Sequence, residues 1–331
     1  MYKIKQTPED FRVEEIPLFE FRDKGDYTYF LLTKKEYNTE NAIQIISRQL
    51  KIPRKKFGYA GTKDRNAITK QHCSVLGKIK DYDYGGFSVK VLGYGDKPIS
   101  LGDLKGNKFI ITLRNIDIKP KKTGFILNYF DDQRFGRKNL EIGLAILKKD
   151  FEKAASMMDH PEVHEHLQQS KNDFIGAIRK IHHKTLKFYV NAVQSFFWNE
   201  VTAEYVKAIT KEFSEVDYKH GKFVISDKKI ADIKIPLLCF DTEFENHEIE
   251  RLYEKVLEKD EIELRDFVIR SIPDITPMGF SRNLIAKVKN MEIGKLEQDE
   301  FNENMKKCIV KFELGKGSYA TIVLRTSLKL F

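Results

Sequence analysis

The N-terminal part of the chain contains the stretch Phe57-Gly-Tyr-Ala-Gly-Thr-Lys-Asp-Arg-Asn-Ala-Ile-Thr-Lys-Gln71. It places one carboxylate, Asp64, between the cations Lys63 and Arg65, in a loop with two glycines. Neighbouring positive charges favour the ionised form of a carboxyl group, and glycine lets backbone or a ligand approach closely. The stretch is typical of a loop that keeps a carboxylate ionised for chemistry. The alternative is an ordinary solvated loop, where Lys-Asp-Arg triplets are common.

Length and composition predict a globular protein of two domains. One hydrophobic core stops growing near ~250–300 residues, and this chain has 331. It is 41% hydrophobic and 32% charged, and it has no run of 18 apolar residues, which indicates no membrane segment. The N-terminal sequence lacks an apolar core and a cleavage site. We therefore expect no secretory signal and a cytoplasmic protein.

Metal-ligating residues are sparse. The cysteines Cys73, Cys239 and Cys308 are odd in number and widely spaced, which argues against a disulfide framework and against a Cys-rich zinc site. His160 and His164 lie four residues apart, but no carboxylate or cysteine with familiar spacing completes a ligand set. The sequence predicts no metal site.

The chain is basic, with a formal net charge of +9 and a pI near 9.1. Clustered cations suit a polyanion, and their binding releases counterions and depends on salt. A solvated basic surface is the alternative. The excess cations are concentrated at Arg54–Lys56, Lys119–Lys122 and Arg179–Lys187.

Strand patterns dominate the two ends of the chain. A two-residue alternation predicts strands near 11–16, 27–33 and 108–114, and again near 284–288, 307–312 and 320–325. Asn38 is a candidate cap for a helix that runs to about Leu50. Strands at both ends around a more helical middle suggest that the C-terminal segment completes the N-terminal sheet.

The middle of the chain has helical spacing. In residues 159–184 the periodicity weakens, which favours a domain boundary or an exposed connection. Val190, Val193, Phe197 and Val201 form a stripe that should face a core. Helices are predicted over 140–158 and over 186–209. A third helix should run from the cap Asn246 to Lys259, and a short strand is predicted at 235–240.

Six blocks in a fixed order resemble the TruD family of tRNA pseudouridine synthases. Ala60–Arg65, followed by Ala67, Thr69 and Gln71, resembles the catalytic motif of that family, in which the Asp is essential. The six blocks span nearly the whole chain, and the other five are Lys5–Glu15, Leu101–Phe109, Asn128–Gly136, Ala192–Asn199 and Gly317–Arg325, the last resembling a closing strand.

The resemblance implies an α+β fold. We expect a pseudouridine synthase catalytic domain with a mixed, mainly antiparallel sheet flanked by helices, and an inserted α/β domain specific to the TruD family. The catalytic domain should comprise residues 1–150 and 286–331, and the insertion residues 151–285. Trp198 stands where the family usually has Phe, Asp131 where Gly is frequent and Thr326 where Glu is common. None of the three touches Asp64, so we expect activity to be retained.

The resemblance also implies the reacting residues. Asp64 would act as nucleophile or as base toward the sugar. Lys5 would be its charge partner, because a carboxylate in a base-sized pocket otherwise gains a proton as water leaves. Phe130 would pack against the uracil that is flipped out of the RNA. From the residues alone, Lys5 reads as an ordinary charged terminus and Phe130 as a core aromatic.

Further residues are expected to hold the RNA. Contacts with the reacting nucleotide are expected from Asn128, Gln71, Lys63, Arg65, Arg134 and Asn199. Contacts with the RNA backbone, which fix position without reading sequence, are expected from Arg54, Lys55, Lys56, Lys70 and Arg282.

The implied substrate is tRNA, with the D-arm uridine at tRNA position 13 as the target. The reaction needs no cofactor or metal, and no obligatory protein partner is expected. One alternative is a non-catalytic RNA-binding or RNA-folding protein on the same scaffold. Another is a metal-dependent nuclease or deaminase, although the sequence lacks the H-x-E and P-C-x-x-C pattern of a deaminase.

Overall fold

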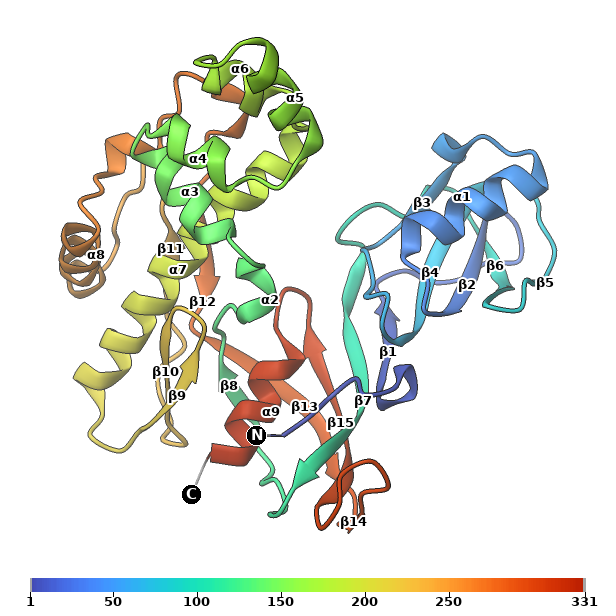
Figure 1. Cartoon of the computed structure of the whole chain (residues 1–331). Helices are drawn as coiled ribbons and strands as arrows, with labels where there is room; N and C mark the ends of the chain where they lie inside the picture. The colour runs from blue at the N-terminus through green and yellow to red at the C-terminus, as the bar shows by residue number, and fades with distance from the viewer. Residues whose placement is uncertain (1, 330–331) are drawn as a thin grey trace. The chain divides into compact units, whose positions relative to one another are not determined.

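The computed structural model describes residues 2–329 (Figure 1) and divides into two compact units. Of the described residues, 2–125 and 287–328 form the first unit, which is discontinuous in sequence, and 126–286 together with Lys329 form the second. In residues 2–329, no helix has the length and apolar content needed to cross a bilayer.

One large sheet organises the first unit. Its strand order is β5-β6-β2-β4-β1-β7-β15-β13-β8, with β3 beside β4 and β14 beside β15. β1 and β4 pair in parallel, whereas β2–β4, β2–β6, β1–β7, β7–β15 and β13–β15 are antiparallel. The expected mixed, mainly antiparallel sheet is thus confirmed. The strands are β1 (Phe11–Pro17), β2 (Tyr27–Lys35), β3 (Phe57–Tyr59), β4 (Ile68–Leu76), β5 (Tyr82–Asp83), β6 (Phe87–Gly95), β7 (Leu104–Ile116), β8 (Phe125–Leu127), β13 (Ile285–Ile293), β14 (Glu297–Gln298) and β15 (Lys306–Gly315).

Helix α1 (Thr39–Leu50) covers one part of this sheet (Figure 1). It begins as predicted, since the Asn38 side chain accepts a hydrogen bond from the Asn41 N–H. Its apolar face, with Ile43 and Ile46, packs on the inward residues of β2 and β4. The 3-10 turn η2 (Arg54–Lys56) then leads into β3 and the Asp64 loop.

The C-terminal segment completes the N-terminal sheet, as expected, because β15 pairs with β7 over most of its length. The strand predicted at 320–325 is wrong. Residues Ala320–Lys329 form helix α9. A short apolar run does not separate a buried strand from a buried helix. Here Ile322, Val323, Thr326 and Ser327 are buried at helical spacing.

The second unit is mainly helical, and the long helix α7 lies at its centre. The four residues of the predicted stripe on α7 are all fully buried, and α7 packs against α3, α8, β10 and β11. The helices are α2 (Asp132–Phe135), α3 (Asn139–Leu147), α4 (Phe151–Met157), α5 (Pro161–Gln169), α6 (Phe174–Arg179), α7 (His183–Ile209) and α8 (His247–Lys259), with 3-10 turns η3 (Leu264–Phe267) and η4 (Pro273–Ile275). The strands pair as β9 (Ser214–Tyr218) with β10 (Gly221–Ile225) and β11 (Lys234–Leu237) with β12 (Phe280–Asn283).

The elements predicted for this unit differ from the structure in detail at three places. The single helix over 140–158 is two helices, because Lys149 has a positive φ of 62° and Asp150 caps α4 through the Lys153 N–H. Residues 159–184, where a domain boundary or an exposed connection was expected, form helices α5 and α6, which pack on each other and have many exposed side chains. The strand expected at 235–240 ends at Leu237. By contrast, Asn246 caps α8 as predicted.

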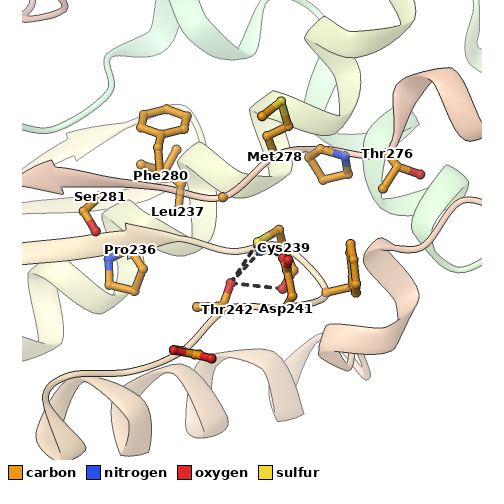
Figure 2. Close-up of a pocket in the computed structure, with 13 residues that line it drawn as sticks. Pro236, Leu237, Cys239, Asp241, Thr242, Thr276, Met278, Phe280 and Ser281 are labelled. Carbon is orange, nitrogen blue, oxygen red and sulfur yellow. Dashed lines mark hydrogen bonds between the residues drawn. The ribbon is translucent and has the colours of Figure 1, made fainter.

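An open pocket of about 490 Å³ lies beside β11 and β12 (Figure 2). Thr242 braces one wall, since its hydroxyl accepts from the Cys239 N–H and donates to the Cys239 carbonyl. Met278 and Phe280 on the other wall are 84% and 56% exposed. None of the residues predicted to hold RNA or to react lines this pocket.

Candidate active site

Asp64 lies on the loop between β3 and β4. Gly58 in β3 has to be glycine, because a Cβ there would lie 2.2 Å from the Ile99 carbonyl oxygen. The side chains of Gln71 and Thr39 both hold the loop backbone. The Gln71 amide donates to the Gly61 carbonyl at 3.2 Å, and the Thr39 hydroxyl accepts from the Lys63 N–H at 3.1 Å. The same hydroxyl donates to Gln71 Oε1 at 2.7 Å, so the two braces support each other.

Lys5 and Asp64 are brought together. The Lys5 Nζ lies 2.6 Å from Asp64 Oδ2, although the two residues are 59 apart in sequence. The side chains are 27% and 32% exposed, so the pair is open to a ligand. Lys5 Nζ also lies 4.2 Å from the centre of the Phe11 ring. A partly exposed carboxylate in its ionised form can attack carbon or accept a proton from a bound ligand.

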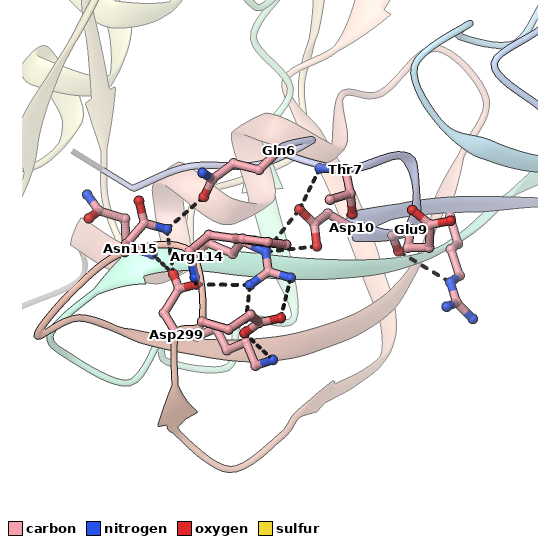
Figure 3. Close-up of polar contacts among 12 residues, drawn as sticks. Gln6, Thr7, Glu9, Asp10, Arg114, Asn115 and Asp299 are labelled. Carbon is pink, nitrogen blue, oxygen red and sulfur yellow. Dashed lines mark hydrogen bonds and ion pairs between the residues drawn. The ribbon is translucent and has the colours of Figure 1, made fainter.

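The N-terminal segment that carries Lys5 is anchored by Arg114 (Figure 3). Lys3 and Arg114 exchange backbone hydrogen bonds, and the buried Arg114 guanidinium donates to Asp10 at 2.9 Å and to Asp299 at 2.9 Å. Lys5 itself has a positive φ of 59° between these anchored points. No local pattern indicates this network, because Arg114 and Asp299 alone lie 185 residues apart in sequence.

The cations that flank Asp64 in sequence point elsewhere. Lys63 forms a buried ion pair with Glu15, and the Arg65 Nε donates to the Glu36 carbonyl at 3.2 Å. Burial opposes the ionisation of Glu15, but hydrogen bonds from His72 and the charge of Lys63 outweigh it and lower the pKa of Glu15. Lys63 therefore ties the loop to β1 in this structure.

Lys34 is a residue of the site that the sequence analysis missed. Its Nζ donates to the carbonyl of Asp64 at 2.9 Å from inside the unit. A signal was present in the alternation of β2, where Phe30, Leu32 and Lys34 follow one another at two-residue steps and are all buried. A lysine in an inward position of a strand is unusual enough to mark a site.

In the second unit, the predicted residues converge on Phe130. The Asn199 amide accepts from the Phe130 N–H at 2.9 Å and donates to the Phe130 carbonyl at 2.8 Å. The ring is 5% exposed and meets the edge of Trp198 at 5.6 Å between centroids. Trp198 thus keeps the core role expected of the usual Phe. The Arg134 guanidinium lies 5.5 Å from the Phe130 ring centre and donates to the Ser195 hydroxyl.

Arg282 and Asn128 form one hydrogen-bonded pair beside this ring. The Arg282 Nε donates to the Asn128 carbonyl at 2.8 Å, and a terminal nitrogen donates to Asn128 Oδ1 at 2.7 Å. The Arg282 Cζ lies 4.1 Å from the centre of the Phe130 ring. The guanidinium therefore stacks on the aromatic ring that was expected to hold a base.

The residues expected on the RNA backbone fall into two groups. Arg54 is paired with Glu40 at 2.6 Å, and Lys70 with Glu14 at 2.8 Å. The pairing with Arg54 lowers the pKa of Glu40 to about 2, chiefly through the hydrogen bond that the guanidinium donates. Lys55 and Lys56 are exposed at the turn before β3. In the part of the chain that the structure describes, no three His, Cys, Asp or Glu side chains are placed to hold a metal ion.

Comparison with known proteins defines the class. The family model described as tRNA pseudouridine synthase D (TruD) matches residues 2–166 and 159–327, which is nearly the whole chain. A solved structure from Methanosarcina mazei, titled "Putative tRNA pseudouridine synthase D (TruD)", has a similar fold, with a TM-score of 0.74 at 26% identity. That likeness covers 99% of this chain and 93% of the solved one. The fold is that of tRNA pseudouridine synthases.

Curated relatives match this chain over nearly their full lengths. A protein of Aquifex aeolicus named tRNA pseudouridine synthase D is 27% identical over 99% of this chain and 98% of its own. A protein of Methanococcus maripaludis named "Probable tRNA pseudouridine synthase D 1" is 28% identical over 98% of both chains. The chain belongs to the TruD family of tRNA pseudouridine synthases.

Proposed function

We propose that this protein isomerises a uridine of tRNA, at position 13 in the D-arm, to pseudouridine, with Asp64 as the reacting carboxylate. The observation that carries the proposal is the contact of 2.6 Å between Asp64 and Lys5, on a partly exposed loop of a TruD family member. tRNA substrates are found in the cytoplasm, which we take as its location.

The reaction breaks the C1′–N1 bond of the nucleotide, turns the detached uracil and joins C1′ to C5. The proton of C5 leaves and N1 regains one, so atoms and electrons balance without a co-reactant. Asp64 either attacks C1′ or removes a proton from the sugar, and both roles require its ionised form. The Lys5 ammonium holds that form while the bound RNA excludes water.

The structure suggests which of the residues expected to contact the nucleotide do so and which instead position other residues. Gln71 is fully buried, and its amide is used by the loop backbone, so we assign it a positioning role in place of the substrate contact expected from the sequence. The same holds for the buried Asn199, which braces Phe130, and for Lys63, which is paired with Glu15. Arg65, Arg134 and Asn128 remain proposed contacts of the nucleotide.

Phosphate contacts are proposed for the exposed Lys55 and Lys56, with Arg54 and Lys70 joining them when RNA competes with their carboxylate partners. Arg282 is already held by Asn128, so we place it at the reacting nucleotide and no longer at the RNA backbone. Residues 151–285 are proposed as the inserted domain and residues 1–150 and 286–331 as the catalytic domain, of which residues 1, 330 and 331 lie outside the described residues.

The test is pseudouridine mapping on an unmodified tRNA transcript, with a metal chelator present. We expect one modified site, at position 13, and no product from a transcript that carries cytidine there. A product that disappears with the chelator, or tRNA binding without any product, would overturn the proposal. The second outcome would favour the non-catalytic RNA-binding alternative.

Lys5→Met is expected to lower kcat by about 100-fold or more, and to raise KM for tRNA by less than about threefold. The methionine keeps the length of the side chain but removes the charge that holds Asp64 ionised, so the chemical step suffers and distant RNA contacts do not. Steady-state kinetics on the tRNA transcript measures both constants. Lys24→Met, at an exposed lysine of the same unit, is the control, and equal losses in kcat and affinity for Lys5→Met would make Lys5 a phosphate contact.

Phe130→Leu is expected to lower kcat/KM by about 10- to 100-fold. A base stacked on an aromatic face gains about 1–3 kcal/mol, and leucine keeps the packing against Trp198 but not that face. The matched control is Phe188→Leu, an exposed aromatic of α7. Equal activity of the two variants would show that Phe130 is a core residue only.

A further inference from the structure

Lys34 contacts the loop that carries Asp64 from the interior of the unit. It lies near the end of β2 and is 1% exposed. Its ammonium donates to three backbone carbonyls, those of Tyr37 at 2.6 Å, Asp64 at 2.9 Å and Lys63 at 3.3 Å. An ammonium has three N–H donors, so all of them are used, and two hold consecutive residues of the loop.

Stability alone does not explain a lysine here. Burying an ammonium is unfavourable unless its donors are satisfied, and a hydrocarbon side chain of similar size would pack at an inward strand position without that penalty. Phe30 and Leu32 fill the two preceding inward positions of β2. In residues 2–329 no ion pair joins Lys34 to a carboxylate, and two of its three donors act on the backbone of the Asp64 loop.

We propose that Lys34 is a positioning residue, whose buried ammonium fixes the carbonyls of the two peptides that flank the Asp64 Cα and so aims the Asp64 carboxylate. This rests on the proposed function of Asp64. Lys5 contacts the carboxylate itself, whereas Lys34 acts through the main chain. Neutralising Lys34 should therefore loosen the loop without touching the RNA.

The charged groups around Lys34 come from the loop and from β4. Burial lowers the pKa of Lys34 to about 8, while the charge of Asp64 opposes this shift and that of Lys63 adds to it. Cys73 on β4 stays a thiol, because burial raises its pKa well above the usual value. Lys63 is held by Glu15. Lys34 is thus the group facing this site that loses its charge just above neutral pH.

The effect of Lys34 on stability and its effect on activity are expected to change with pH in opposite directions. Between pH 8 and the ordinary lysine value of 10.5, the unfolded chain binds the Lys34 proton more tightly than the folded chain does. The contribution of Lys34 to the free energy of unfolding therefore rises with pH in this range. Activity is expected to fall over the same range, because a neutral amine has one donor fewer for the loop.

The experiment compares single-turnover rates on tRNA from pH 6.5 to 9.5. We expect the wild-type rate to fall with a midpoint near pH 8. Lys34→Met should be at least tenfold slower at pH 7 and nearly flat with pH, and its Kd for tRNA should stay within twofold. Lys34→Arg keeps the cation at all these pH values and should remove the alkaline fall. Lys35→Met, on the outward face of β2 beside Glu9, is the matched control and should resemble wild type.

A wild-type rate that stays flat to pH 9, or the same alkaline fall in Lys34→Arg as in wild type, overturns the proposal. Hydrogen exchange of the amides of residues 61–66 gives a readout that needs no turnover. After correction for the base-catalysed intrinsic rate at each pH, it should accelerate at least tenfold in Lys34→Met and in wild type above pH 8, and unchanged corrected exchange overturns the proposal. If wild type forms no pseudouridine while its exchange follows this pattern, the proposed function fails and the role of Lys34 stands.

Discussion

Asp64→Asn is expected to reduce the single-turnover rate of pseudouridine formation at least about 1,000-fold, to the limit of detection. An amide neither ionises nor accepts a proton readily, so it can serve as neither nucleophile nor base. The side chain keeps its size, and Lys5 can still donate to the amide oxygen. The loop should therefore keep its shape, and the Kd for tRNA should change by less than about threefold.

The control for this variant is Asp23→Asn, an exposed aspartate of the same unit. It should retain wild-type rate and affinity, which excludes a general effect of losing one negative charge. Activity of Asp64→Asn within tenfold of wild type would contradict the role given to Asp64. A loss of tRNA affinity as large as the loss of rate would make Asp64 a binding residue.

Arg114→Met is expected to lower the free energy of unfolding by about 3–5 kcal/mol. Removing one member of a buried ionic network leaves its partners as buried charges without compensation. Asp10 and Asp299 are both nearly inaccessible and both accept hydrogen bonds from this guanidinium. Urea unfolding at pH 7 measures the loss. Arg22→Met, which breaks an exposed pair with Asp96, should change stability by less than about 1 kcal/mol.

The pH dependence of this effect follows from the acids around Arg114. Burial opposes the ionisation of Asp299, but hydrogen bonds from the Asn115 and Phe301 N–H groups outweigh it and lower its pKa. The hydrogen bond from Arg114 lowers the pKa of Glu300 to about 2. Lowered carboxyl pKa values stabilise the folded state above about pH 4, and this stabilisation is lost as pH falls toward 2. The difference between wild type and Arg114→Met should shrink over that range, and a constant difference would contradict the account.

The regular part of the fold could be predicted from local patterns. Buried and more exposed residues alternate along much of β1, β2, β7 and β15. Asn38 and Asn246 mark the starts of the helices that they cap. Two errors have local causes. Ala320–Lys329 is a short buried helix whose apolar residues resemble a strand, and the break between α3 and α4 depends on the positive φ of Lys149.

The candidate site was predictable in part. Asp64 could be singled out from its own neighbours, whereas Lys5 and Phe130 came only from family resemblance. No local pattern indicates that Lys5 reaches Asp64, since strand pairing brings them together across 59 residues. Lys63 lies beside Asp64 in sequence, but its partner is Glu15 on another strand, which no local pattern indicates.

The central claim is that this chain joins C1′ to C5 of a tRNA uridine by means of Asp64. Forming that bond expels the hydrogen at C5, so tRNA labelled with tritium at C5 of uridine reports it directly. Wild type should release about one equivalent of tritium per tRNA into water, and Asp64→Asn should release none. No release by wild type, or equal release by both proteins, would contradict the account.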